Sequence, residues 1–533
     1  MRGTVAFLLL VVAVAARAEQ LGTVTFSTSC AASTQSSFNR GVALLHDFWY
    51  EEAQRQFQQI SISDPDCAMA HWGVAMSVFH QIWNRPDEVT MSLGWSELEK
   101  AESRPAKTIR EREYISALRI FYKPGKRDYE TRIDAYSAAM SKLFTVFPED
   151  VDAGAFYALS LLANKPLNDT TVDHERQALA ALEPLWAKHP DHPGLVHYII
   201  HACDNPQLAG QGLEAAERYG QIAPSAAHAA HMPSHIFARL GMWQSDVNAN
   251  VASVAAAEKA LEAHHSSIFD ELHADDFLLY AYLQSGQDAR AKGLVDATGR
   301  IVANGERMAH RPGMEMSDML PYFRNKAPVF YFLEMRDWKS AAALRPSPGT
   351  PEDAQTMTYW ARIVANGHLR QAAAARADLA KYDAVVEEMK RGKYAYGAQA
   401  TGALIQHDEV LAWAAFAQGN EGEALTHMRA AADLQDKVGQ AEVDIPAREM
   451  LGDILLELRR PSEALTEYDA ALRMCPNRFN GLFHAGQAAE AAGDKARATR
   501  YYSALLKITS NGTQSARAEL AHAKTFVSTK QAE

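Results

Sequence analysis

Apolar residues recur at every third or fourth position through most of the chain, which is the spacing of amphipathic helices. Alternating apolar and polar runs, which are typical of half-buried strands, are nearly absent. The pattern therefore predicts an all-α protein. Because 533 residues are too many for one ordinary hydrophobic core, we expect several domains or an extended repeat array.

A spacing of 34 residues organises the expected helices. One set of landmarks is Leu451, Gly452, Leu455, Ala464, Tyr468, Ala471 and Pro476. A second set, one period later, is Ala485, Gly486, Ala489, Ala498 and Tyr502, and a set near the N-terminus is Gly41, Leu44, Ala53, Phe57 and Pro65. These landmarks resemble the tetratricopeptide repeat, in which small residues let two antiparallel helices approach closely. The resemblance implies an α-solenoid of antiparallel helix hairpins with roughly nine to eleven units.

The segment PSPGTP at 346–351 is the clearest linker and marks the expected boundary between two lobes. The predicted organisation has four parts. These are a signal peptide at 1–18, a tetratricopeptide-like solenoid with a histidine-lined groove at 19–344, a linker at 345–352 and a C-terminal solenoid at 353–533.

The first residues have the pattern of an export signal. Met1 and Arg2 precede an unbroken apolar run over residues 5–16, and Ala16-Arg17-Ala18 resembles a cleavage site. The run is too short to span a bilayer, which needs about 20 apolar residues, and no other segment approaches that length. We therefore expect no membrane span and a secreted or periplasmic location after cleavage near Ala18.

The charge balance narrows the range of partners. The chain has 53 Lys and Arg against 65 Asp and Glu, a formal net charge of −12, and no basic stripe stands out. This composition argues against a nucleic-acid partner and against adsorption to an anionic membrane surface.

Four cysteines are too few for a fold built on disulfides. Cys30 precedes the first repeat and Cys67 follows its final proline, so one helix hairpin brings the two together. In an oxidising compartment we expect a disulfide between them, and two buried thiols are the alternative. Cys203 and Cys475 are expected to stay outside any disulfide.

Histidines follow the repeat period more often than random placement gives. Four pairs of the 20 histidines are 34 residues apart: His46/His80, His197/His231, His201/His235 and His231/His265. His197 and His201 are also four residues apart, as are His231 and His235, so both rings of each pair leave the same helix face. Pro233 predicts that a helix starts late or kinks inside the second pair.

The resemblance to the tetratricopeptide repeat implies a position for these rings. It places His228, His231 and His235 on the concave groove, with His197 and His201 beside them. The following unit adds His273 and Asp276, and His46 and His80 fall near the groove edge of the first two units.

Imidazole nitrogens suit zinc, copper or iron and do not suit calcium or magnesium. We therefore predict that a transition metal ion is held jointly by His197, His201, His231 and His235. Further ligand candidates are His46, His80, His228 and His273. Asp204 and Asp276 are candidate catalytic bases or partners of the ligands. The pairs do not form H-E-x-x-H, so the metalloprotease pattern is missing.

Two classes of function stay open. The first is an exported metalloprotein, a metal-dependent hydrolase or oxidase if it is catalytic. The second is a non-catalytic scaffold whose concave groove holds a peptide or protein partner. The mature chain resembles a group of secreted bacterial tetratricopeptide proteins through the stretches 41–52, 67–76 and 231–240. That resemblance implies the fold and export, and it supplies no substrate.

Overall fold

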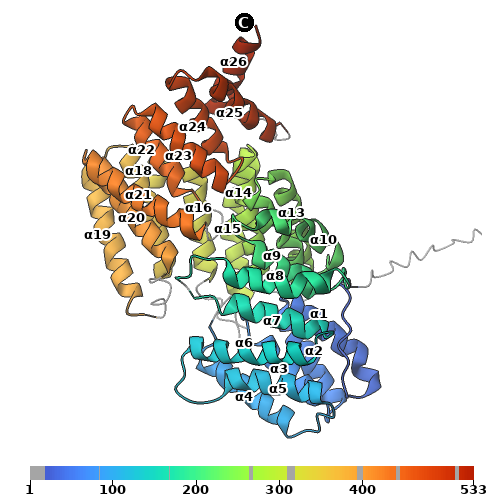
Figure 1. The fold of residues 1–533 in the computed structure, drawn as a ribbon. Coiled ribbons are helices and arrows are strands. Elements are labelled where there is room, and N and C mark those ends of the chain that lie inside the picture. Colours follow the sequence, from blue (N-terminus) through green and yellow to red (C-terminus); the bar gives the residue numbers. More distant parts are fainter. Residues whose placement is uncertain are drawn as a thin grey trace, which may run out of the picture.

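A computed structural model describes residues 19–82, 85–166, 168–262, 268–308, 319–347, 349–392, 400–439, 444–510 and 515–532. Within these ranges the chain is helical and contains no strand. Consecutive helices pack as antiparallel hairpins that stack along the chain (Figure 1). The predicted all-α tetratricopeptide solenoid is confirmed, whereas the predicted signal peptide at 1–18 lies outside the described residues.

The first part of the solenoid runs to α14. Its helices are α1 (Gln35–His46), α2 (Tyr50–Ser63), α3 (Ala68–Ser77), α4 (Glu88–Glu102), α5 (Ile109–Tyr122), α6 (Tyr129–Val146), α7 (Val151–Ala163), α8 (Asp173–Trp186), α9 (Pro193–Cys203), α10 (Leu213–Ile222), α11 (Ala227–His231), α12 (Pro233–Arg239), α13 (Trp243–Glu262) and α14 (Ile268–Gln284). Two short 3₁₀ helices, η1 (Ala32–Thr34) and η2 (Ala209–Gly212), precede α1 and α10.

The remaining helices continue the array to the C-terminus. They are α15 (Asp288–Met308), α16 (Met319–Glu334), α17 (Trp338–Ala342), α18 (Glu352–His368), α19 (Ala372–Met389), α20 (Thr401–Ala417), α21 (Glu421–Val438), α22 (Ala447–Glu457), α23 (Pro461–Met474), α24 (Phe479–Ala491), α25 (Lys495–Ile508) and α26 (Ala518–Ala532). No helix among the described residues has the length and hydropathy needed to cross a membrane.

A glycine and an aromatic residue make the same contact in the repeats that the sequence marks most clearly. The glycine lies on the first helix of a hairpin and the ring on the second. The pairs are Gly41 and Phe57, Gly452 and Tyr468, and Gly486 and Tyr502. A Cβ added at the glycine would lie 2.7 Å from the ring in the first two pairs and 2.4 Å from it in the third, so only glycine permits this close packing.

The first hairpin carries the predicted disulfide between Cys30 and Cys67, whose Cα atoms are 4.8 Å apart. The bond joins the segment before α1 to the N-cap of α3 and closes a separation of 37 residues. In the chain-entropy model a loop of this length contributes about 4 kcal/mol to stability. Cys203 and Cys475 are buried and lie outside this disulfide.

Two large hydrophobic cores account for most of the buried residues. The first contains residues from Leu21 to Phe237, the second contains residues from Val329 to Ala523, and two smaller clusters lie between them. The predicted linker at 345–352 joins α17 and α18, and residues on both sides of it belong to the second core.

The loop before α24 packs back against the middle of the chain, where α14 and α24 are in contact (Figure 1). Gly241 has φ 63°, and a Cβ there would lie 2.3 Å from the Pro476 carbonyl oxygen. Trp243 donates from Nε1 to the backbone oxygen of Asn477 at 2.6 Å. The solenoid therefore closes on itself between residues some 230 positions apart in sequence.

Candidate metal centre

Six histidines gather where α9, α11, α12 and α14 meet. They form two groups of three, and within each group the potential ligand nitrogens all lie within 4.8 Å of one another. Triad A consists of His197, His201 and His228, and triad B consists of His231, His235 and His273. Each triad combines one of the i, i+4 pairs seen in the sequence with a single histidine from another helix.

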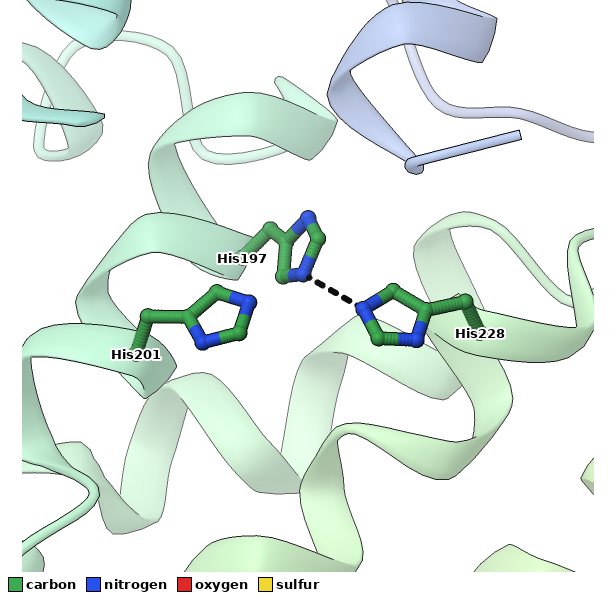
Figure 2. Close-up of side chains that lie close together, drawn as sticks. All are labelled: His197, His201 and His228. Carbon is green, nitrogen blue, oxygen red and sulfur yellow. Dashed lines mark hydrogen bonds between the residues drawn. The ribbon is translucent and has the colours of Figure 1, made fainter. Parts of the chain in front are cut away.

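In triad A, His197 and His201 leave the same face of α9, and His228 of α11 faces them (Figure 2). The Nε2 atoms of His197 and His228 are 3.2 Å apart. Two nitrogens bound at 2.0–2.1 Å to one tetrahedral ion would be about 3.3 Å apart. His201 adds a buried Nε2 that has no hydrogen-bond partner. The three rings are thus arranged as ligands around one point.

In triad B the helix is interrupted between the two histidines of the pair. α11 ends at His231 and α12 begins at Pro233, so the break predicted from the proline is confirmed. The Nε2 atoms of His231 and His235 are 3.0 Å apart, and the ring centroids of His231 and His273 are 4.4 Å apart.

Hydrogen bonds to the other ring nitrogens fix the protons of triad B. His231 Nδ1 lies 2.7 Å from Asn250 Oδ1, and Asn250 Nδ2 donates to the backbone oxygen of Asp246, which orients the amide. His235 Nδ1 lies 2.8 Å from Asp204 Oδ2, and a carboxylate only accepts. Both Nδ1 atoms therefore carry a proton, and both Nε2 atoms of the neutral rings present lone pairs. Two lone pairs 3.0 Å apart need a cation between them, either a proton or a metal ion.

One ring of triad A is fixed in a similar way. His197 donates from Nδ1 to the backbone carbonyl of His46 at 2.5 Å, which leaves its Nε2 lone pair directed at the triad. Metal-bound histidines commonly donate their second ring N–H to a carbonyl, amide or carboxylate oxygen in this way, which fixes the ring and its tautomer. All three kinds of acceptor occur here: a backbone carbonyl for His197, an amide oxygen for His231 and a carboxylate for His235.

Burial keeps these rings neutral. His197, His228 and His231 are exposed by only 0, 6 and 1%, respectively, and burial lowers the pKa of each well below its ordinary value, with neighbouring histidines adding to the shift. Burial also lowers the pKa of His201 to about 3. Neutral imidazole is the form that binds a metal ion, so these four rings are in that form at neutral pH.

A phenylalanine lies against each triad. The Phe48 ring centroid is 4.4, 5.5 and 5.4 Å from the three rings of triad A, and the Phe277 centroid is 4.8, 4.5 and 5.6 Å from those of triad B. Phe48 lies in the turn between α1 and α2 and has φ 57°, a conformation that also occurs at Arg370 and Arg459 in the turns of later hairpins. Each triad therefore has an apolar neighbour in contact with all its rings.

Of the two predicted acidic residues, Asp204 lies beside the centre as the partner of His235. Arg239 Nε also donates to its carboxylate, at 2.9 Å. Burial alone would raise the pKa of Asp204, but Arg239 and His235 outweigh burial and hold it well below its usual range. Asp204 thus orients the His235 ring. Asp276 on α14 forms a buried ion pair with Lys326 at 2.5 Å.

His46 and His80 lie outside both triads. His46 Nε2 is 2.9 Å from Asp152 Oδ1, and these two residues form a separate buried group with His192. The His80 ring stacks on Tyr50, and its Nε2 is 3.3 Å from a backbone oxygen. The His46 backbone carbonyl, rather than its ring, contacts the centre.

The arrangement differs from the predicted single site of four histidines. The structure divides His197, His201, His231 and His235 between the two triads, because one repeat moves a pair to the next hairpin, about 8–10 Å away. The third nitrogen comes from residues that were only further candidates, His228 and His273. His197, His228 and His231 are also buried rather than spread along an open groove, since Phe48 and the end of α1 cover triad A, and the other three rings are partly buried.

Several residues of this centre were not predicted. Phe277 is four residues after His273 on the same helix face, so its spacing could have indicated it. Phe48 and Asn250 carry no such pattern, and only the packing of distant helices brings them to the triads.

Comparison with known families agrees with this architecture. Residues 449–513 match the tetratricopeptide repeat family, and this stretch contains all landmarks of both C-terminal sets. The match shows that this stretch consists of tetratricopeptide repeats, and the hairpin fold of the other described residues agrees with it.

No curated protein matches the sequence. Among solved structures, the human IFIT1 dimer with m7Gppp-AAAA is 12% identical, with 88% of this chain and 95% of that chain covered and a TM-score of 0.38. The APC/C hetero-tetramer Cut9–Hcn1 is 11% identical, with 93% and 89% covered and a TM-score of 0.35. Similarities at this level carry no argument about function.

Proposed function

We propose that this chain is an exported tetratricopeptide-repeat protein whose buried histidine triads bind a transition metal. The observation that carries the proposal is the pair of Nε2 lone pairs in triad B, 3.0 Å apart, on rings whose Nδ1 protons are already donated elsewhere.

A metal ion accounts for more of the geometry than a proton does. A proton shared by His231 and His235 would satisfy those two nitrogens and no others, whereas the potential ligand nitrogens of triad B number three. It would also leave the buried Nε2 of His201 in triad A without a partner. An ion bound by a triad satisfies three nitrogens at once and keeps an open coordination position for water or another small molecule. With such a position the centre suits hydrolytic or oxidative chemistry.

Export is part of the proposal. The apolar run over residues 5–16 and the small residues near Ala18 support it at the sequence level. The disulfide between Cys30 and Cys67 supports it independently, because such bonds persist in oxidising compartments.

A second function, binding of a protein partner, is favoured by the C-terminal repeats. Residues 449–513 match a repeat that commonly presents a surface to other proteins, and they are remote in sequence from the triads. Partner binding and metal binding are compatible on this solenoid.

The test is metal analysis of the protein purified from its native compartment without a metal-binding tag or chelators. We expect stoichiometric zinc, copper or iron, and we expect it to be lost from the double variant His201→Ala with His235→Ala. The matched control is His427→Ala in α21, whose ring contacts Asp408 instead of other histidines. Circular dichroism confirms that each variant keeps its helices. A native protein that holds no metal and takes none up, or equal uptake by the double variant, would contradict the proposal.

A further inference from the structure

The two triads are neighbours. His228 of triad A and His231 of triad B are three residues apart on α11, which is about 4.5 Å of helix rise. Their ring centroids are 6.1 Å apart, and His228 is also 6.2 Å from His201. The six rings thus form one continuous cluster, and ions held by the two triads would lie next to each other.

We propose that the triads hold a pair of copper ions, one in each triad, that act together on dioxygen. This inference rests on the proposed metal-binding function and adds the number of ions, their identity and the class of molecule that reacts with them.

The ligands in the triads favour copper in its monovalent state. Each triad offers three neutral imidazoles, and neither thiolate nor carboxylate belongs to either group among the described residues. The nearby Asp204 carboxylate is already balanced by Arg239. Two divalent ions would bring four positive charges into this buried volume, whereas two Cu(I) ions bring two, and the cost of burying an ion rises steeply with its charge.

The phenylalanine contacts also favour Cu(I). Phe48 and Phe277 place an apolar ring against all three imidazoles of triads A and B, respectively. A divalent zinc or iron ion with three imidazoles requires further ligands, usually water, and an apolar ring disfavours water. Cu(I) is a soft ion that is stable with three nitrogen ligands and no water.

A pair of copper ions matches the electron demand of dioxygen. Each Cu(I) gives up one electron and becomes Cu(II), so the pair supplies two electrons. One dioxygen molecule accepts both electrons and, with two protons, becomes hydrogen peroxide. The burial of His197, His228 and His231 favours a reactant as small as dioxygen over a large substrate.

The experiment loads the full-length protein with Cu(I) under anaerobic conditions and measures copper per chain after removal of loosely bound ion. Single variants separate the triads: His201→Ala removes a ligand from triad A, and His235→Ala removes one from triad B. His427→Ala is again the control. We expect two copper ions in the wild type and the control, one in each single variant and none in the double variant.

The loaded proteins are then exposed to dioxygen. We expect the wild type to form one peroxide for each pair of copper ions. We also expect its oxidised form to show less Cu(II) spin, by electron paramagnetic resonance, than its copper content, because the two ions are coupled. Each single variant should show one full Cu(II) spin for its remaining copper.

The outcomes distinguish this inference from the proposed function. One copper ion in the wild type, lost from either single variant, overturns the pair and leaves a single metal site. Stoichiometric zinc with no retention of Cu(I) overturns the copper assignment while metal binding stands. Two full, independent spins in the oxidised wild type overturn the joint action. Failure to hold any metal removes the proposed function itself.

Discussion

At the scale of single residues, Asp204 is the most informative position beside the centre. Its carboxylate accepts from both His235 Nδ1 and Arg239 Nε and so fixes the ring through charge as well as geometry. Asp204→Asn keeps the shape and removes the charge. Partners of this kind contribute about 10- to 100-fold to metal affinity, so we expect a loss of that size in a competition titration with a chromophoric chelator.

Asp191→Asn is the matched control for that variant. Asp191 is an exposed carboxylate that also faces an arginine, Arg218, at 3.5 Å, and it has no contact with the triads. We expect its metal affinity to equal that of the wild type. If both variants bind metal as tightly as the wild type, Asp204 does not orient a ligand.

His484 on α24 gives a residue-scale prediction about pH. Burial is the main cause that lowers the pKa of His484 to about 3. The positive charge of Arg336 and the neighbouring His368 lower this pKa further, whereas the Asp453 carboxylate raises it. The folded state therefore keeps this ring neutral, whereas the unfolded state binds a proton below about pH 6.5. The contribution of the neutral ring to the free energy of unfolding is fully present above that pH and is lost as the pH falls toward 3. Between pH 7 and pH 5 the loss is about 2 kcal/mol.

His484→Phe removes this proton-linked loss and keeps a ring of similar shape. We expect the free energy of unfolding of the variant, measured in urea at pH 7 and at pH 5, to fall less than that of the wild type by about 2 kcal/mol. Identical pH dependence of the two proteins would show that the ring binds a proton in the folded state.

At the scale of helices and hairpins, the sequence carried most of the fold because the repeat is a local signal. The spacing of Gly452 and Tyr468 predicts a close hairpin, and in the structure the two residues pack against each other. Pro233 likewise predicts the break between α11 and α12. The third histidine of each triad was only a further candidate, because the local spacing does not show which rings meet: His273 reaches His231 through the packing of α14 against α11.

Ala464 on α23 tests whether the best-matching repeats are purely structural. Its side chain is fully buried, so Ala464→Leu overpacks one hairpin and should lower the free energy of unfolding by about 1–3 kcal/mol. Thr466→Leu, on an exposed position of the same helix, should change stability little. Metal content per folded molecule should stay constant in both variants. A selective loss of metal from folded Ala464→Leu protein would place the metal site elsewhere.

At the scale of the whole molecule, closure of the solenoid depends on one buried cation. Arg478 precedes α24 and is fully buried. Its guanidinium donates to Glu449 on α22 at 2.9 Å and to Glu334 on α16 at 2.7 Å, and it also contacts the Tyr280 hydroxyl on α14. One side chain therefore joins four helices that span about 200 residues of sequence.

Arg478→Met should loosen this closure without changing the local repeats. Methionine fills much of the same volume but leaves the Glu334 and Glu449 carboxylates buried without their cation, a change that costs about 3–5 kcal/mol. We expect a loss of this size in guanidinium chloride unfolding. Adding Glu334→Gln and Glu449→Gln to the same chain should restore part of the stability, because neutral amides tolerate burial better than carboxylates. A loss of less than about 1 kcal/mol in Arg478→Met, the range of an exposed ion pair, would show that the closure does not depend on this cation.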